Sequence, residues 1–250
     1  MSASPELRAT WLGRMPYLDA WRLQEAVATR VRSGGPDRLL LLEHDPVYTI
    51  GRRGTTDHLL AGPAVLRATG ASVYRVDRGG DITYHGPGQL VGYPVTRFAE
   101  GADLVKYVRA MEEALRDVLA SFGVASHTRE GKTGVWVMLG EGRPAKIGAI
   151  GVRVSRGVTT HGFALNVATD LSAFELVLPC GFQHEVASLA RLGVSADIRS
   201  VADRAASAFA DRLGRALARD ASIPPPRDAE IPMDAPVRSA VDLLAEAVPA

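Results

Sequence analysis

Residues 145–167, AKIGAIGVRVSRGVTTHGFALNV, decide the fold class of this 250-residue chain. The stretch holds two runs rich in valine, isoleucine and threonine, residues 145–155 and 158–167, with a short glycine turn between them. β-Branched residues favour strands, and a short turn joins strands that run antiparallel. Together with a similar run at residues 133–139, the stretch predicts an antiparallel meander.

Lys146 stands at the start of the first run. Counting by twos places it on the apolar face of the strand, away from Arg153 and together with Gly148, Ile150, Val152 and Val154. Burial lowers the pKa of a lysine from about 10.4, so this amine can act as a base near neutral pH or, while cationic, stabilise a thiolate. A bulge that resets the register would instead leave a surface lysine.

Helix and strand patterns surround the meander. Apolar residues at helical spacing predict helices over residues 17–32 and 104–122, with Asp103 and Gly123 as caps of the second. A last helix is predicted by Val201, Ala205, Phe209, Leu213 and Leu217. Further strands are expected at residues 39–42, 47–50, 71–76 and 89–95, the first two joined by a turn that contains His44. The pattern predicts an α+β fold in which helices flank a mixed, largely antiparallel sheet.

A single domain is expected over residues 1–221, because no linker or internal repeat interrupts it. Residues 222–250 are interpreted as a proline-rich C-terminal appendage. They hold too many prolines for a core segment, namely Pro224, Pro225, Pro226, Pro232 and Pro236.

Composition narrows the classes of partner. Lys and Arg number 29 against 28 Asp and Glu, and this net charge of +1 gives no global reason to expect nucleic acid or a membrane as partner. The N-terminus carries Pro5, Glu6 and Arg8 where a secretory signal needs an apolar run, and no transmembrane run is present. We expect a cytoplasmic, monomeric protein.

Cys180 is the only cysteine of the chain and lies in the turn-like stretch LPCGF, residues 178–182. A lone cysteine excludes an intrachain disulfide, and it is either an inert buried thiol or a reactive one. Reactivity requires a neighbouring cation or base, because a free thiol is mostly protonated at neutral pH. His184 shares an i,i+4 spacing with it, but no cluster of ligands accompanies the pair, so no metal is expected.

Two further features are open to two interpretations each. His161 is either the base of a cysteine–histidine–asparagine set or a hydrogen-bonded pocket residue. The glycines of residues 79–80 and 86–88 either let backbone amides approach a ligand or serve only the turn, and they do not form a phosphate-binding fingerprint.

Several blocks resemble one known family in order and spacing. They are YTIGR at residues 48–52, RGGDITYHGPGQ at 78–89, AKIGAIG at 145–151, THGFALN at 160–166 and PCG at 179–181. Together they closely resemble the octanoyltransferases of lipoate biosynthesis over roughly residues 40–190.

The resemblance implies a biotin/lipoate-ligase-like catalytic domain. It implies transfer of an octanoyl group from the phosphopantetheine of acyl carrier protein to a lysine of lipoyl domains, in E2 subunits of 2-oxoacid dehydrogenases and in glycine cleavage H protein. By this matching Cys180 carries the acyl group as a thioester and Lys146 lowers the pKa of that thiol, without ATP or a metal.

The resemblance also implies an acyl pocket, with His161 as a close neighbour. The matching residues are Arg78, Gly79, Gly80, Asp81, Ile82, Thr83, Tyr84, His85, Ala149, Ile150, Gly151, Gly162, Phe163 and Ala164. An eight-carbon chain needs an apolar tunnel, for which we expect Ile82, Ile150, Val152 and Phe163. Arg52, Arg53, Arg153 and Arg156 are expected to meet the acidic carrier protein.

Two rival functions remain open. An ATP-dependent lipoate or biotin-type protein ligase of the same fold would use the loop GRRG at residues 51–54 on phosphates, but it leaves Cys180 unexplained. A catalytically inactive binding protein for acyl carrier domains would keep Cys180 as a buried thiol, which slow alkylation would reveal.

Overall fold

The computed structural model of the chain describes residues 5–178 and 185–224. An eight-stranded sheet has the order β11-β1-β2-β6-β10-β9-β8-β7, and a three-stranded sheet has the order β4-β3-β5. The large sheet consists of β1 (Glu6–Met15), β2 (Asp37–His44), β6 (Gln89–Val95), β7 (His127–Arg129), β8 (Lys132–Leu139), β9 (Arg143–Ser155), β10 (Val158–Asn166) and β11 (Ala216–Arg219). The small sheet consists of β3 (Val47–Ile50), β4 (Ser72–Arg75) and β5 (Ile82–His85).

The strand pairing confirms the predicted α+β class and its mixed, largely antiparallel sheet. Only β1 with β2, β1 with β11, and β3 with β4 run parallel among the paired strands of the described residues. The predicted meander is present as β8, β9 and β10, paired antiparallel.

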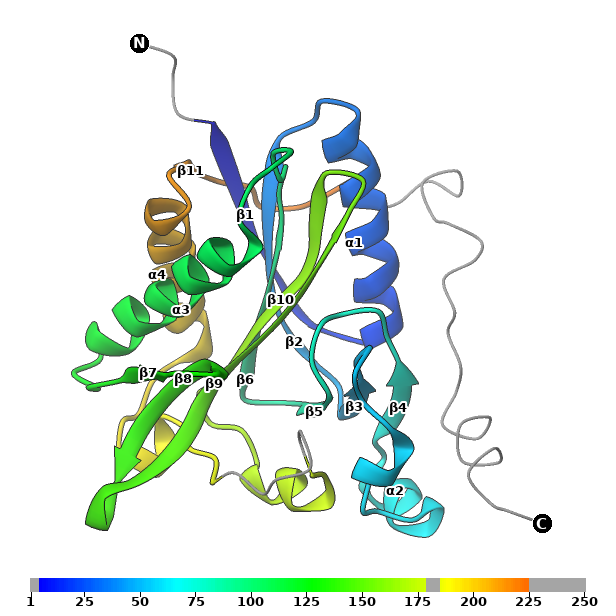
Figure 1. Cartoon of the computed structure of the whole chain (residues 1–250), viewed down its shortest axis with the longest axis vertical. Coiled ribbons are helices and arrows are strands. Elements are labelled where there is room, and N and C mark those ends of the chain that lie inside the picture. Colours follow the sequence, from blue (N-terminus) through cyan, green and yellow to red (C-terminus); the bar gives the residue numbers. More distant parts are fainter. Residues whose placement is uncertain (1–4, 179–184, 225–250) are drawn as a thin grey trace.

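Helices cover both faces of the large sheet. The α-helices are α1 (Tyr17–Arg32), α2 (Pro63–Thr69), α3 (Leu104–Ala120) and α4 (Ile198–Arg212), and 3-10 turns lie at Thr56–His58, Gly140–Gly142, Leu171–Leu176 and Ala190–Leu192. α1 packs on one face of the sheet and α3 with α4 on the other (Figure 1). Asp103 caps α3 as predicted, accepting from the N–H groups of Val105 and Lys106. No helix of the described residues is long and apolar enough to cross a bilayer.

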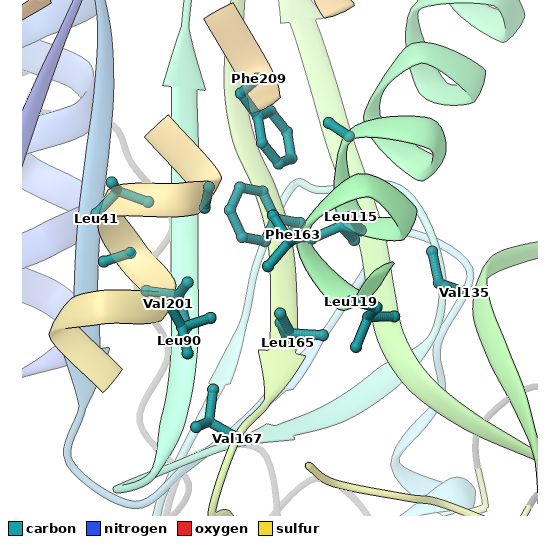
Figure 2. Packing of buried hydrophobic residues seen from close by; sticks show 14 of the residues in the cluster. Leu41, Leu90, Leu115, Leu119, Val135, Phe163, Leu165, Val167, Val201 and Phe209 are labelled. Atoms are coloured by element: carbon teal, nitrogen blue, oxygen red, sulfur yellow. The ribbon is translucent and has the colours of Figure 1, made fainter. Parts of the chain in front are cut away.

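The largest core cluster lies between the sheet and the α3–α4 pair (Figure 2). Phe163 of β10 stacks on Phe209 of α4 with ring centroids 4.3 Å apart, and Leu115 and Val135 belong to the same cluster. Alternate residues of β10 thus supply this core, which fixes the faces of the strand.

Two sequence expectations are corrected, and one strand was missed. The last helix ends at Arg212 and does not reach Leu217, which lies in β11, because Gly214 turns the chain with a φ of 64°. The runs at residues 39–42 and 47–50 form strands as expected, but in different sheets, and His44 is the last residue of β2 and not part of the turn. β1 was not predicted at all. The domain boundary at residue 221 stays a prediction, and most of the appendage lies outside the described residues.

Candidate active site

The segment between β4 and β5 carries the first predicted site residues, Arg78–Asp81. Its backbone is held from two sides. Arg52 N–H donates to Arg78 O at 3.0 Å, and Gly79 N–H donates to Val152 O of β9 at 3.0 Å. The segment therefore bridges the small sheet and the large one.

Two glycines outside the segment make this close approach possible. A Cβ on Gly51 would lie 2.5 Å from Gly80 O, and one on Gly151 would lie 2.7 Å from Gly79 O. For the glycines at residues 79–80 these contacts support the structural interpretation, since their carbonyls pack against Gly51 and Gly151 and a Cβ on Gly79 would lie 3.2 Å from Val152 O.

Arg78 is buried and braces the same segment. Its Nε and Nη2 donate to Thr49 Oγ1 at 3.2 and 2.9 Å, its Nη2 also donates to Thr49 O at 2.6 Å, and its Nη1 donates to Gly79 O at 3.0 Å. These charge-assisted bonds keep the guanidinium pressed against β3.

Of the two expectations for Lys146, the structure shows the one with a β-bulge in β9: the lysine does not share the strand face of Gly148, Ile150 and Val152, although it is half-buried and not a surface residue. β8 pairs Val135 with Gly148 but Trp136 with Lys146, which leaves Ile147 as an extra residue. Ile147 faces the core under α3, and a Cβ on Gly148 would meet a side chain of the same core. Lys146 therefore points to the opposite face of the sheet.

That opposite face is the one on which the Arg78–Asp81 segment lies. Gly151 points at Gly79, and Arg153 pairs with Asp77 Oδ2 at 2.6 Å. The bulge thus brings Lys146 to the side of the sheet that carries the other predicted site residues.

Lys146 is half-buried beside an aromatic ring. Its Nζ lies 4.8 Å from the centroid of the Trp136 ring, a cation–π contact that stabilises the ammonium. Its backbone is held by the chain that returns after the 3-10 turn at Leu171–Leu176: Lys146 N–H donates to Glu185 O at 2.8 Å, and Ala187 N–H donates to Lys146 O at 2.9 Å.

His161 is buried in a strained conformation. Its φ of 57° turns its N–H out of the strand ladder toward Gln24 Oε1 of α1, at 2.8 Å. Its Nε2 donates to Asp77 Oδ1 at 2.7 Å, which leaves Nδ1 without a partner among the described residues. Burial lowers the pKa of His161, so the ring is held neutral. His161 is thus a hydrogen-bonded residue that holds Asp77, next to Arg78.

His85 is also buried and neutral. Burial, followed by the neighbouring His44 and Arg78, lowers the pKa of His85 to about 3. Its Nδ1 lies 2.7 Å from Gln89 Oε1, and its Nε2 lies 3.4 Å from Thr49 Oγ1. The ring contacts the residue that braces Arg78.

Cys180 and residues 179–184 around it lie outside the described residues, but the chain before them is held at the Arg78–Asp81 segment. Leu178 N–H donates to His58 O at 2.8 Å, and His58 Nδ1 lies 2.6 Å from Asp81 Oδ2. Cys180 is two positions after Leu178 in the chain, which spans at most about 7 Å.

The chain after Cys180 is held at Lys146. Val186 forms a parallel bridge with Lys146, and Glu185 O accepts from its N–H. Val186 is six positions after Cys180 in the chain, which spans at most about 20 Å. The described chain before Cys180 is thus attached at the Arg78–Asp81 segment, and the described chain after Cys180 is attached at Lys146.

The four residues predicted to line an acyl tunnel do not lie around one common space in the structure. Phe163 is stacked in the core under α4, whereas Ile82 belongs to a separate cluster with Tyr48 and Tyr84. Ile150 and Val152 are half-buried at the margin of the cluster that contains Phe163. Both lie on the core face, as the alternation along the strand predicts, and so point away from Lys146 and from the Arg78–Asp81 segment.

The remaining predicted pocket residues divide between the sheets. Thr83 pairs with Thr49 in the small sheet, and Tyr84 meets Phe174 edge-on at 5.7 Å between ring centroids. In the large sheet Ala164 packs under α1, Ala149 pairs with it, and Gly162 leaves space for Gly92 O of β6.

The four arginines expected to meet a carrier protein differ in availability. Arg153 is paired with Asp77, whereas Arg52 and Arg53 are exposed in the turn after β3 and Arg156 is exposed in the turn before β10. Among the described residues no three His, Cys, Asp or Glu side chains are grouped as a metal site, and the Cys180–His184 pair lies outside them.

Sequence reasoning missed four residues that connect this region: His58, Thr49, Gln89 and Asn166. Their partners are distant in the chain; Gln89 and Asn166 are 77 residues apart and His58 and Asp81 are 23 apart. The sequence blocks end at Gln89 and Asn166, which is the only local signal for either.

The comparisons with known proteins agree on one family. The model of the lipoyl protein ligase A/B catalytic domain matches residues 16–210. The octanoyltransferase of Mycolicibacterium smegmatis is 49% identical over 85% of this chain and 91% of its own length. That of Solibacter usitatus is 48% identical over 80% of this chain and 89% of its own length.

Solved structures agree on the fold. A bi-partite lipoate protein ligase from Thermoplasma acidophilum superimposes with a TM-score of 0.71 at 20% identity, covering 88% of each chain. A lipoate-protein ligase A bound with ATP gives a TM-score of 0.70 at 20% identity, covering 87% of this chain and 90% of that one. The biotin/lipoate-ligase-like fold implied by the sequence blocks is confirmed, and this chain belongs to the lipoyl protein ligase A/B catalytic-domain family.

Proposed function

We propose that this chain is an octanoyltransferase that carries the acyl group on Cys180. The donor is octanoyl-acyl carrier protein, which presents the group on phosphopantetheine, and the acceptor is a lysine of a lipoyl domain. The identity of 48–49% to curated octanoyltransferases over most of the chain supports the overall activity. Neither ATP nor a metal takes part in the proposed reaction.

One observation carries the assignment of the nucleophile. The chain on one side of Cys180 is held at His58 and Asp81, and the chain on its other side is held at Lys146. Because the described chain on the two sides of Cys180 is attached at these two groups, we infer that the thiol acts together with Lys146 and the Arg78–Asp81 segment.

The first half-reaction begins from a Cys180 thiolate and a Lys146 ammonium. The thiolate attacks the carbonyl carbon of the donor thioester, the bond from that carbon to the phosphopantetheine sulfur breaks, and Lys146 gives a proton to the leaving thiolate. One thioester replaces another, so little free energy separates the two states.

The second half-reaction restores the ion pair. The neutral amine of the acceptor lysine attacks the Cys180 thioester and forms the amide, Lys146 takes one of its protons, and Cys180 leaves as thiolate. The contact of Lys146 with Trp136 favours a cation in the resting state, which fits stabilisation of a thiolate better than a permanently neutral base. The scheme predicts ping-pong kinetics.

The turn after β3, at residues 51–54, does not have the free N–H groups that the ligase alternative would use to bind phosphate. A phosphate-binding loop needs free backbone N–H groups. Here the N–H groups of residues 51–54 donate to Asp81 O, Arg78 O, Gly80 O and Gly51 O, respectively. Only the Arg52 and Arg53 side chains of this turn are exposed to a phosphate.

Intact-protein mass spectrometry after incubation with octanoyl-acyl carrier protein tests the proposal. The wild type should gain one hydroxylamine-labile octanoyl group, Cys180→Ser should gain none, and Lys146→Ala should gain it more slowly. Addition of a lipoyl domain should discharge the adduct. A lipoyl domain modified by Cys180→Ser at the wild-type rate would overturn the thioester step, and pyrophosphate release from ATP with free octanoate would favour the ligase.

The finer partner assignments belong to this proposal. Lipoyl domains of E2 subunits and glycine cleavage H protein are the proposed acceptors, and Arg52 and Arg53 are the proposed contacts of the acidic carrier. The cytoplasmic location and monomeric state expected from the sequence stay predictions.

A further inference from the structure

Gln89 and Asn166 lie side by side at the ends of two strands. They are direct partners in the β6–β10 register, and both are buried, with 2% and 5% of their surface exposed. Gln89 Nε2 donates to Asn166 Oδ1 at 3.0 Å. Two uncharged amides buried in this way are costly to leave unpaired, so their remaining bonds matter.

Backbone carbonyls fix the orientation of both amides. Gln89 Nε2 also donates to Tyr84 O at 3.2 Å, and Asn166 Nδ2 donates to Ala187 O at 3.0 Å. A carbonyl only accepts, so each NH₂ group must point at its carbonyl and each amide oxygen must point the other way.

This orientation determines the tautomer of His85. Gln89 Oε1 lies 2.7 Å from His85 Nδ1 and accepts, so the proton of the neutral ring is on Nδ1. His85 Nε2 then carries a lone pair and accepts a hydrogen bond from the Thr49 hydroxyl at 3.4 Å. The oxygen of Thr49 is left to accept from Arg78 Nε and Nη2.

The other end of the chain of bonds reaches Lys146. Asn166 holds Ala187 O, Leu189 N–H donates to Asn166 O at 3.1 Å, and Ala187 N–H donates to Lys146 O at 2.9 Å. Asn166 is thereby bonded to Ala187, which itself pairs with Lys146, and to Leu189 two residues further along the chain.

We propose that the Gln89–Asn166 amide pair holds the Arg78–His85 segment in register with the chain that pairs with Lys146. Gln89 and Asn166 are then positioning residues for acyl transfer. In the chain of side-chain hydrogen bonds from Arg78 to Ala187 O, each group donates to the next one. The kinetic part of this inference rests on the proposed function.

The wild-type protein provides the first test. Nitrogen-15 NMR of the histidine side chains should show His85 as the neutral Nδ1–H tautomer throughout pH 5–8, because its ring is buried and its Nδ1 donates to Gln89. Detection of the Nε2–H tautomer would overturn the directed chain, whatever the enzymatic activity.

Two isosteric variants provide the kinetic test. Gln89→Glu removes the donor to Tyr84 and Asn166 and sets a carboxylate against His85, so His85 should be protonated near neutral pH. Asn166→Asp removes the donor to Ala187 O. In both variants kcat per folded molecule should fall about tenfold or more, equal to about 1.4 kcal/mol of transition-state stabilisation, with KM for the carrier within about twofold.

Thr159→Val is the matched control. Thr159 Oγ1 donates to Pro94 O at 2.7 Å and so joins the same two strands at the far end of β10. It should lose stability but keep kcat within about twofold, because its bonds lead away from His85.

The outcomes separate the two proposals. If both isosteric variants keep the wild-type kcat while Cys180→Ser abolishes turnover, the positioning role is wrong and the proposed function stands. If Cys180→Ser remains active, the thioester step is wrong, and the NMR tautomer still decides the hydrogen-bond chain.

Discussion

Replacement of Gly51 by alanine tests whether the Arg78–Asp81 segment lies against the end of β3. Gly51 has no positive φ, so alanine fits its backbone conformation. The added Cβ would lie 2.5 Å from Gly80 O and 2.8 Å from Arg78 Nη1. The Gly80 carbonyl accepts a hydrogen bond from Arg53 N–H, so it cannot move away without weakening that bond.

The expected magnitude follows from two opposing effects. Overpacking costs about 1–3 kcal/mol, and the smaller entropy of the unfolded alanine chain returns about 0.4–1 kcal/mol. A shift of the segment does not avoid the cost, because it weakens the bonds from Arg52 and Arg53 to the segment, each worth about 1 kcal/mol. We expect Gly51→Ala to lower the free energy of unfolding by about 1–2 kcal/mol.

Urea unfolding and acyl transfer measure the two consequences. Gly140→Ala is the matched control, since a Cβ there meets nothing within 4 Å and its φ is not positive. The control should change the free energy of unfolding by less than about 0.5 kcal/mol and leave turnover unchanged. Gly51→Ala should also slow acyl transfer, because Arg78 is displaced. Equal stability and turnover in the two variants would refute the placement of the segment.

Three further predictions concern His161, the core and Lys146. Burial raises the pKa of the Asp77 carboxyl, but the hydrogen bond from His161 and the charge of Arg153 outweigh it and hold this pKa below its usual value. Asp77 therefore stabilises the fold at neutral pH, and this contribution is lost as pH falls through its folded pKa. Between pH 7 and pH 3 the urea midpoint should fall less for Asp77→Asn than for the wild type. Phe163→Ala should cost about 3–5 kcal/mol in unfolding free energy without changing the preferred acyl chain length, since Phe163 faces Phe209; a changed preference would restore it to the tunnel. Trp136→Leu removes a cation–π contact worth about 0.5–2 kcal/mol, so alkylation of Cys180 near neutral pH should slow, and an unchanged rate would contradict a cationic Lys146.

Regular elements could be predicted from the sequence because their periodicity is local. The helix predicted at residues 17–32 is α1, and the strand predicted at residues 89–95 is β6, with identical bounds. The buried face of α1 follows from spacing alone, as the burial of Trp21 and Val31 illustrates. The family resemblance was predicted from short blocks in the same way, and it is confirmed by the relatives.

Elements whose pairing is distant could not be predicted. β1 depends on its pairing with β2 and β11, and Leu217 of β11 fits the apolar spacing of α4 although Gly214 has already ended the helix. Lys146 was assigned to the wrong face because a bulge inserts one residue into β9, and a period of two cannot register an insertion. The amide pair of Gln89 and Asn166 was missed because only the fold makes them neighbours.

The departures from regular structure gather where the two sheets meet. The bulge at Ile147 turns Lys146 to the side of the Arg78–Asp81 segment, and the left-handed conformation of His161, which costs about 1–2 kcal/mol, turns its ring toward Asp77 on that side too. A regular strand at either position would direct these polar side chains into the core under α3 and α4, where a charge or an unpaired ring nitrogen is strongly unfavourable. Because of each irregularity, a strand whose other residues face the apolar core can direct one polar side chain to the site on the opposite face of the sheet. The same reasoning explains why sequence periodicity predicts the core of this protein well and the orientation of its site residues poorly.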